Sequence, residues 1–368
     1  MKKCKKRFLL QYYSLILLFF VFSVIFITGC GSPPGKDSAK PYFVVLPYGG
    51  KEMIYSEDGN TWNKENLEVG DWMYFTGVCY GNGRFVAVTG GTSIFYSKEG
   101  IKWIEIQTVN NWRGICFGDD TFVAVGYELI FGTPYPRVAY SFDGVNWTSV
   151  ALSGSNWNFQ NVCYGNNRFV AMGDLNKIAY SSDGISWTEI IPPSLSSADW
   201  ARICFGNGRF VIVAGTNSNK VAYSENGEVW VEKTMPTVAW KNSICYGNGK
   251  FVAVGSSGGY SAVAGKEAAY SDDGDTWHPA TMPEDSHWNR VCYGNGKFVA
   301  ISSNKAASSP NGEDWAPMVI PALTPPAMNW SCIAYGGDSR NLRLFASLKE
   351  KSSALLAYVT GKKFKLGF

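Results

Sequence analysis

Histidine and charge are both scarce in this chain of 368 residues. His278 and His287 are the only histidines, so a Ser-His-Asp triad has almost no material. Charged residues make up 17% of the chain, which argues against a disordered or strongly nucleic-acid-binding protein. There is also no phosphate-binding P-loop and no dinucleotide-binding glycine motif. We therefore expect no nucleic-acid partner and no cofactor.

Patterns of metal ligands are missing as well. The chain has nine cysteines but no C-x-x-C motif and no closely spaced histidine pair. Residues 272–275, Asp-Asp-Gly-Asp, are acidic but lack the ligand spacing of an EF-hand calcium loop. The sequence therefore predicts no metal site.

The N-terminus has the pattern of an export signal. A basic cluster at residues 2–7 precedes an apolar run over residues 8–27, and Thr28 and Gly29 lead to Cys30. A cysteine directly after small residues resembles the lipobox of bacterial lipoproteins. That resemblance implies cleavage before Cys30 and a diacylglycerol thioether on its sulfur.

We predict a signal peptide at residues 1–29, a flexible stalk at residues 30–40 and a protein anchored on the outer face of the cell membrane. The apolar run is also long enough to span a bilayer, so an uncleaved anchor is the alternative. The signal holds five basic residues and no acid, and without it the formal net charge changes from +3 to −2. A nearly neutral mature chain favours no polyanionic partner.

Aromatic residues and glycine are abundant, and they recur in a repeat of about forty residues. Its clearest phrase, Ser-x-(Asp, Glu or Asn)-Gly-x-x-Trp, we call the box. The boxes begin at Ser56, Ser97, Ser141, Ser181, Ser224, Ser271 and Ser309. Six of them follow a tyrosine, which suggests a strand entering each box.

A second phrase lies between the boxes and is clearest at residues 203–211, Ile-Cys-Phe-Gly-Asn-Gly-Arg-Phe-Val. It predicts a strand, a tight Asn-Gly hairpin of type I′ and a second strand. A third strand enters the box, and the box tryptophan opens a fourth. A repeated four-stranded antiparallel meander is the blade of a β-propeller, so we predict an all-β propeller over residues 41–368.

The number of blades depends on how the two ends of the chain pair. We predict seven blades, because the C-terminal strand around Cys332 then completes the blade that begins near Phe43 and Tyr55, which removes a free sheet edge. Candidate strands at residues 344–348 and 355–359 are then surplus. An eight-bladed ring is the alternative.

The box resembles the Asp-box, or BNR repeat, of sialidases and related propellers, and the resemblance covers nearly all of residues 41–330. In that family the box is a structural turn on the outer rim. Glutamate or asparagine replaces aspartate in three copies, an exchange that suits a turn and not a catalytic acid. We therefore predict structural, non-catalytic roles for Asp58, Asp143, Asp183 and Asp273.

Seven of the cysteines recur once per repeat. Equivalent positions in neighbouring blades are about 10 Å apart, too far for a disulfide. We expect reduced, buried thiols that behave as small apolar side chains.

Catalysis by a sialidase-like site is the enzymatic alternative. The early Phe/Tyr-Arg-Ile-Pro motif of sialidases is absent, and residues 41–44, Pro-Tyr-Phe-Val, stand in its place. Arg113, Arg202 and Arg290 each follow an inner tryptophan by one or two residues, which we take as equivalent repeat positions. Guanidinium groups there could face the central channel and bind a carboxylate together, or simply serve packing.

The variable loops after the second strand of each blade lie opposite the boxes and are the expected ligand face. Two are long, at residues 126–137 and 255–267. Their aromatic residues could stack on sugar rings or peptide side chains. The inner tryptophans either line the same region or wedge between blades. With the three arginines, the candidate ligand-binding set is Trp112, Trp200, Trp288, Tyr127, Tyr135 and Tyr260.

The leading hypothesis is a monomeric, non-catalytic, lipid-anchored module that binds a glycan, peptide or envelope protein. A second is an assembly or scaffold factor, since the photosystem II assembly propeller of cyanobacteria and plastids is similar in fold. A sialidase-like exo-glycosidase is the third. The ligand itself is not named by the sequence, because one fold hosts many functions.

Overall fold

The computed structural model describes residues 42–70, 73–154, 156–215, 218–256, 265–322, 324 and 329–337, with only the backbone at 237–241. The predicted signal peptide and stalk, Cys30, Tyr260 and the surplus C-terminal strands lie outside these residues. The described chain is entirely strand, turn and loop. None of it forms a helix that could cross a membrane.

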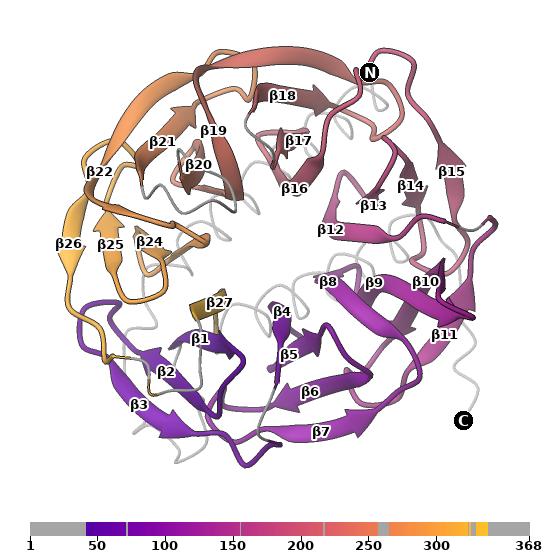
Figure 1. Ribbon diagram of the computed structural model, residues 1–368, viewed down its shortest axis with the longest axis horizontal. Coiled ribbons are helices and arrows are strands. Elements are labelled where there is room, and N and C mark those ends of the chain that lie inside the picture. Colours follow the sequence, from indigo (N-terminus) through magenta and orange to yellow (C-terminus); the bar gives the residue numbers. More distant parts are fainter. Residues whose placement is uncertain are drawn as a thin grey trace, which may run out of the picture. The chain divides into compact units, whose positions relative to one another are not determined.

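Seven four-stranded antiparallel blades surround a central axis, which confirms the predicted seven-bladed propeller (Figure 1). From the innermost strand outward, blade 1 consists of β27 (Asn329–Gly336), β1 (Tyr42–Tyr48), β2 (Glu52–Ser56) and β3 (Asn63–Asn66), and blade 2 of β4 (Phe75–Gly81), β5 (Arg84–Thr89), β6 (Ser93–Ser97) and β7 (Ile104–Gln107). Blade 3 consists of β8 (Asn111–Gly118), β9 (Thr121–Ile130), β10 (Thr133–Ser141) and β11 (Thr148–Ala151). Blade 4 consists of β12 (Phe159–Gly165), β13 (Arg168–Gly173), β14 (Ile178–Ser181) and β15 (Thr188–Ile190).

Blades 5 and 6 share one long strand, β19 (Val231–Gly247), which is outermost in blade 5 and innermost in blade 6. The other strands are β16 (Trp200–Gly206), β17 (Arg209–Ala214) and β18 (Ser218–Ser224) in blade 5; β20 (Lys250–Ser256), β21 (Gly265–Ser271) and β22 (His278–Ser286) in blade 6; and β23 (Arg290–Gly294), β24 (Lys297–Ile301), β25 (Ala306–Ser309) and β26 (Ala316–Met318) in blade 7.

The ring closes as the seven-bladed arrangement predicts. Strand β27 pairs antiparallel with β1, with Ala334 opposite Val44 and Gly336 opposite Tyr42. The last strand of the described residues therefore becomes the inner strand of the first blade. Because β27 and β1 pair with each other, neither strand is left as an unpaired strand where the ring closes.

Packing between blades explains the glycine that ends each inner strand. The aromatic ring of the next blade lies directly against that glycine, where any Cβ would overlap the ring. The seven contacts are Gly81 with Phe117, Gly118 with Tyr164, Gly165 with Phe205, Gly206 with Tyr246, Gly247 with Tyr293, Gly294 with Tyr335 and Gly336 with Tyr80. The contacts form an unbroken circle, so every blade is fixed to both neighbours in the same way.

The second strand of each blade forms the core. In β5, the run Phe85 to Val88 is completely buried on both faces, because each blade is covered by its two neighbours. The hairpin before it has positive φ at Asn82 (45°) and Gly83 (77°), as a type I′ turn requires. The predicted Asn-Gly hairpin is therefore confirmed.

Each box forms a hydrogen-bonded turn between the third and fourth strands. In blade 1, Ser56 Oγ accepts from Gly59 N–H (2.8 Å) and donates to Asp58 Oδ1 (3.0 Å). The same Oδ1 accepts from the backbone N–H groups of Asn60 and Thr61, at 2.7 Å each. The carboxylate thus satisfies donors of its own turn.

The same bonds recur in five of the other six boxes, and asparagine replaces aspartate in two of these. The carboxylates of Asp143, Asp183 and Asp273 each accept from two successive backbone N–H groups. Asn226 Oδ1 accepts the equivalent pair, as does Asn311 Oδ1, at 2.9 to 3.0 Å. A neutral amide oxygen therefore accepts the same backbone hydrogen bonds as a carboxylate oxygen.

Candidate functional site

The propeller has two unlike faces. The turn-and-box face carries the Asn-Gly hairpins and the boxes, and the chain enters β1 and leaves β27 there, at Tyr42 and Gly337. The loop face, on the other side, carries the links into the inner strands and the loops between second and third strands. On the turn-and-box face, Asn82 Nδ2 donates to Phe142 O of the next blade's box, and Asn248 Nδ2 bonds likewise to Pro310 O. These polar groups are already used in joining blades.

The central channel is lined by one position of every inner strand, four residues before its final glycine. The residues there are Gly77, Gly114, Asn161, Arg202, Ser243, Arg290 and Cys332. The following position is valine or isoleucine in every blade, and it lines the same channel. An apolar ring thus lies beside a ring whose chemistry changes from blade to blade.

This register corrects the predicted equivalence of the cysteines. Cys79, Cys116, Cys163, Cys204, Cys245 and Cys292 lie two residues before the glycine, where blade 1 has Ala334. Cys332 lies two residues earlier and lines the channel instead. All seven are free thiols, as expected. Burial raises the pKa of Cys79, and burial raises that of Cys332 to about 11 although the Arg290 charge opposes the rise.

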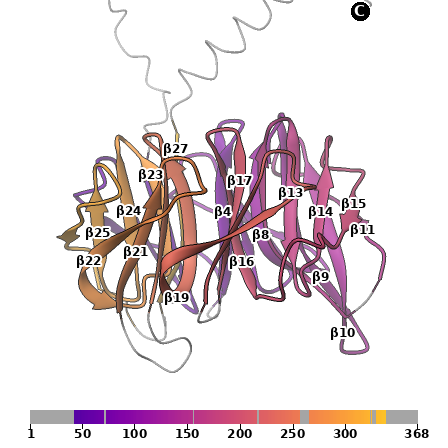
Figure 2. The same ribbon diagram turned by 90° about the horizontal axis from the view of Figure 1, so that it is seen from above.

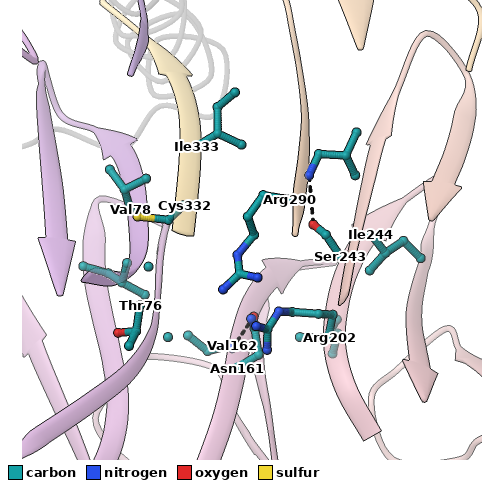
Figure 3. A pocket seen from close by; sticks show the side chains of 15 residues that line it. Thr76, Val78, Asn161, Val162, Arg202, Ser243, Ile244, Arg290, Cys332 and Ile333 are labelled. Atoms are coloured by element: carbon teal, nitrogen blue, oxygen red, sulfur yellow. Dashed lines mark hydrogen bonds between the residues drawn. The ribbon is translucent and has the colours of Figure 1, made fainter. Parts of the chain in front are cut away.

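Arg202 and Arg290 occupy equivalent positions and extend into one cavity of about 210 Å³ in the channel (Figure 3). Arg290 Nη1 donates to the carbonyl oxygens of Asn289 (2.8 Å) and Asn242 (3.4 Å), and Arg202 Nη1 donates to Ala201 O (2.7 Å). Burial lowers the pKa of Arg290. None of the described residues that line the cavity is acidic.

Arg113 does not join them, which corrects the predicted three-arginine set. It lies one position earlier, at a β-bulge between Trp112 and Gly114, and is absent from the cavity lining. A residue at a bulge turns its side chain away from the face its neighbour occupies. Arg113 lies over the ring of Tyr127, 5.5 Å from its centroid, and donates to its hydroxyl at 3.4 Å. It therefore belongs to the loop face.

The bulge position has a structural use in other blades. Thr76 Oγ1 donates to Trp112 O (3.0 Å), Asn242 Nδ2 to Trp288 O (3.0 Å) and Ser331 Oγ to Phe75 O (2.7 Å), each across to the next blade. In blades 3 and 4 the bulge residues, Arg113 and Gln160, bond within their own blade instead. These blades are where the loop face departs from the repeat.

The inner tryptophans are not ligand-binding residues as placed. The side chains of Trp112, Trp200 and Trp288 are 1%, 4% and 0% exposed. Trp112, for example, belongs to a buried cluster with Val86 and Val88 of the preceding blade and Ile115 of its own blade. The alternative of wedges between blades is the one the geometry favours, because an indole enclosed on both sides has no face left for a ligand.

The long loop predicted at residues 126–137 is instead a continuation of β9 and β10. The two strands pair without a break out to Ile130 and Thr133, and the hairpin extends from the edge of the disc (Figure 2). Tyr127 and Tyr135 are half-buried on it. Its tip carries Phe131, which is fully exposed (105%) and has a φ of 50°. Phe131 is not in the candidate set predicted from the sequence.

An ion pair between Arg137 and Glu128 joins the two strands of the hairpin. Arg137 Nε donates to Glu128 Oε2 at 2.9 Å across the two strands, and both side chains are partly buried. Leu129, near the tip, is 53% exposed. Two apolar side chains therefore stand in solvent on an ordered support. No other hairpin between second and third strands is as long among the described residues.

The described residues contain no cluster of histidine, cysteine or acidic groups that could hold a metal ion. The box carboxylates have perturbed acidity for a structural reason. Backbone N–H groups of Thr61 and Asn60 hold the pKa of Asp58 well below its usual range, and those of Asn146 and Val145 do the same for Asp143. Such shifts here mark turns and not a catalytic pair.

No family model matches the chain, and neither does any curated protein. Among solved structures, an inactive virginiamycin B lyase from Staphylococcus aureus with quinupristin is similar, with a TM-score of 0.58, 12% identity, and coverage of 72% of this chain and 92% of that one. YCF48 bound to D1 peptide gives 0.51, 12%, 78% and 88%, and a nidogen–laminin complex gives 0.51, 8%, 80% and 98%. At these identities the likeness supports the propeller fold alone.

Proposed function

We propose that this protein is a non-catalytic binding module, lipid-anchored outside the cytoplasm, that recognises an envelope protein or peptide through the β9–β10 hairpin of its loop face. The observation that carries the proposal is the tip of that hairpin. Phe131 is fully exposed there, so its ring contributes no burial to the fold. An aromatic side chain held in solvent on a rigid support is a typical anchor for a partner's pocket.

The backbone at the tip strengthens this argument. A phenylalanine at positive φ costs roughly 1 to 2 kcal/mol relative to the right-handed region. Asparagine holds the equivalent first turn position in the hairpins at Asn82, Asn207 and Asn248. A side chain that is both unfavourable in its turn and unburied is retained more easily for binding than for stability.

A protein partner fits the tip better than a glycan does. Leu129 and Phe131 are wholly apolar, whereas sugar recognition combines an aromatic face with nearby polar groups. The interface would gain from a hairpin already ordered by its strand pairing and by the Arg137–Glu128 ion pair, because little conformational entropy remains to be lost. Glycan binding remains the alternative within the same class.

The predicted tether agrees with this use of the two faces. The chain enters the propeller at Tyr42 on the turn-and-box face, so a lipid anchor on Cys30 would leave the loop face clear. Lipid attachment is tested by metabolic labelling with a fatty-acid analogue. Labelled wild type and unlabelled Cys30→Ala protein are expected, and equal labelling of both would contradict the anchor.

The sialidase-like alternative has weaker support. Cleavage of a glycosidic bond needs a general acid, most often a carboxyl group, to protonate the leaving oxygen. The channel cavity has no acidic group among its described lining residues. Release of a fluorophore from a fluorescent sialoside by the purified protein would revive this alternative.

The binding proposal is tested by photo-crosslinking in isolated envelopes. Wild-type protein is expected to give one discrete crosslinked species, which the double variant Leu129→Ser, Phe131→Ser loses. Phe142→Ser is the matched control, because Phe142 is also well exposed (59%) but lies in a box on the opposite face. Equal crosslinking by all three proteins would contradict the proposal. Retention on a glycan array, again lost in the double variant, would favour the glycan alternative.

A further inference from the structure

The arginines of the channel ring are not required by the repeat. Blades with Gly77, Gly114 or Ser243 at the same position build the same inner strand with the same pairing. The inner strand therefore does not require an arginine at this position, which sets Arg202 and Arg290 apart from the repeat.

Two positive charges share a confined space. Arg290 is half-buried, its hydrogen bonds go to the backbone carbonyls of Asn242 and Asn289, and burial lowers its pKa. Among the described residues no carboxylate forms an ion pair with it. Arg202 reaches into the same cavity (Figure 3). Two positive charges in a site with little water repel each other. The free-energy cost of holding them there falls sharply when an anion binds between them.

Neutral donors face the same space. Ser243 Oγ accepts from Val291 N–H at 3.1 Å, which leaves its hydroxyl hydrogen to donate elsewhere. Asn161 Oδ1 accepts from Val162 N–H at 2.8 Å, so its amide N–H groups are the part able to donate into the cavity. Ser243 and Asn161 flank Arg202 in the channel ring, one blade to either side. The set is rich in donors and poor in acceptors, which is the composition of an anion site.

We propose that the channel binds one small oxyanion, a carboxylate or phosphate group, between Arg202 and Arg290. A cavity of about 210 Å³ is smaller than the usual pocket for a drug-sized ligand and suits an anion of a few heavy atoms. The inference goes beyond the proposed function and does not depend on the β9–β10 hairpin. Occupancy would stabilise the ring at its centre, because the anion binds blades 5 and 7 together.

Calorimetric titration and thermal unfolding of the full-length protein in detergent test the site. The probes are malonate and, separately, inorganic phosphate, in chloride buffer of constant ionic strength. We expect saturable binding of one anion per chain and a melting temperature that rises with anion concentration. The stronger of the two probes identifies which oxyanion geometry the site prefers.

Variants separate a binding site from a structural one. Arg290→Gln and Arg202→Gln are each expected to weaken anion binding at least about tenfold, since each removes charge-assisted hydrogen bonds. Without anion, Arg290→Gln should melt no lower than wild type, because it removes a buried charge. Arg84→Gln is the control, since Arg84 stacks on Tyr96 away from the channel, and it should bind normally.

Three results would overturn the inference. One is the absence of saturable binding of either probe at millimolar concentration. Another is an equal loss of binding in Arg84→Gln, which would indicate unspecific attraction. The third is Arg290→Gln protein that binds the probe like wild type, or that melts well below wild type in anion-free buffer, as a purely structural arginine would require.

Discussion

The turn-and-box face and the loop face are built from the same repeat but use their side chains differently. On the turn-and-box face, box oxygens, hairpin asparagines and inner glycines are all occupied in joining strands and blades. On the loop face, blades 3 and 4 replace the bond to the next blade with local contacts, and one hairpin extends beyond the others. Regularity marks the part that holds the ring together, and departures from it mark candidate sites.

The largest expected effect comes from breaking the circle of glycine and aromatic contacts. Gly206→Val places a side chain where the ring of Tyr246 lies, so we expect a loss of about 3 kcal/mol in unfolding free energy, or failure to fold. Gly91→Ala, in a loop-face connection with open space around it, should change stability very little. Urea denaturation of both proteins makes the comparison, and similar losses would remove the distinction between the faces.

The second-largest effect on stability is expected from acid, which protonates the box carboxylates of the turn-and-box face. The pKa of Asp58 and that of Asp143 lie well below the usual range because backbone N–H groups bond to the carboxylates. A depressed pKa in the fold means that stability is fully present above the unfolded value of about 4 and is lost as pH falls through the folded pKa. The melting temperature should therefore decline as the pH falls from about 5 to about 2. A melting temperature that is flat over this range would contradict the role of the boxes.

A substitution in a single box should have a smaller effect on stability, and it allows a closely matched control variant. Asp143→Ala should cost about 1 kcal/mol, as loss of a helix-capping side chain does. Asp143→Asn should cost much less, because Asn226 and Asn311 already make the same bonds in their own boxes. Equal losses in the two variants, measured by denaturant unfolding, would mean that charge and not hydrogen bonding holds the turn.

The smallest effect on stability is expected at the hairpin tip. Phe131→Asn places in the turn the residue that Asn82 and Asn207 provide elsewhere, and it removes no buried surface. Stability should stay unchanged or rise by up to about 1 kcal/mol, while the crosslinked species of wild type disappears. A clear loss of stability in thermal unfolding would show that Phe131 serves the fold after all.

The repeat in the sequence was enough to predict the blade, the type I′ hairpins and the closure of a seven-bladed ring. The blade and the hairpins depend on contacts within one repeat, so a local pattern carries the information. Closure pairs the two ends of the described chain, and the incomplete first and last repeats indicated it. The free state of the cysteines followed from the same logic. The hydrogen bonds of Asp58 follow from its own turn, where residues two and three positions away supply the donors.

What only the tertiary structure decided is which side chains share the channel. A β-bulge before the inner strand's channel position turns neighbouring residues to opposite sides, so Arg202 and Arg290 meet while Arg113 does not. The same register places Cys332 apart from the other cysteines. Strand pairing also extended residues 126–137 into a hairpin that exposes Phe131. Side chains alternate with a period of two along a strand, so a shift of one residue at a bulge decides which face each side chain occupies.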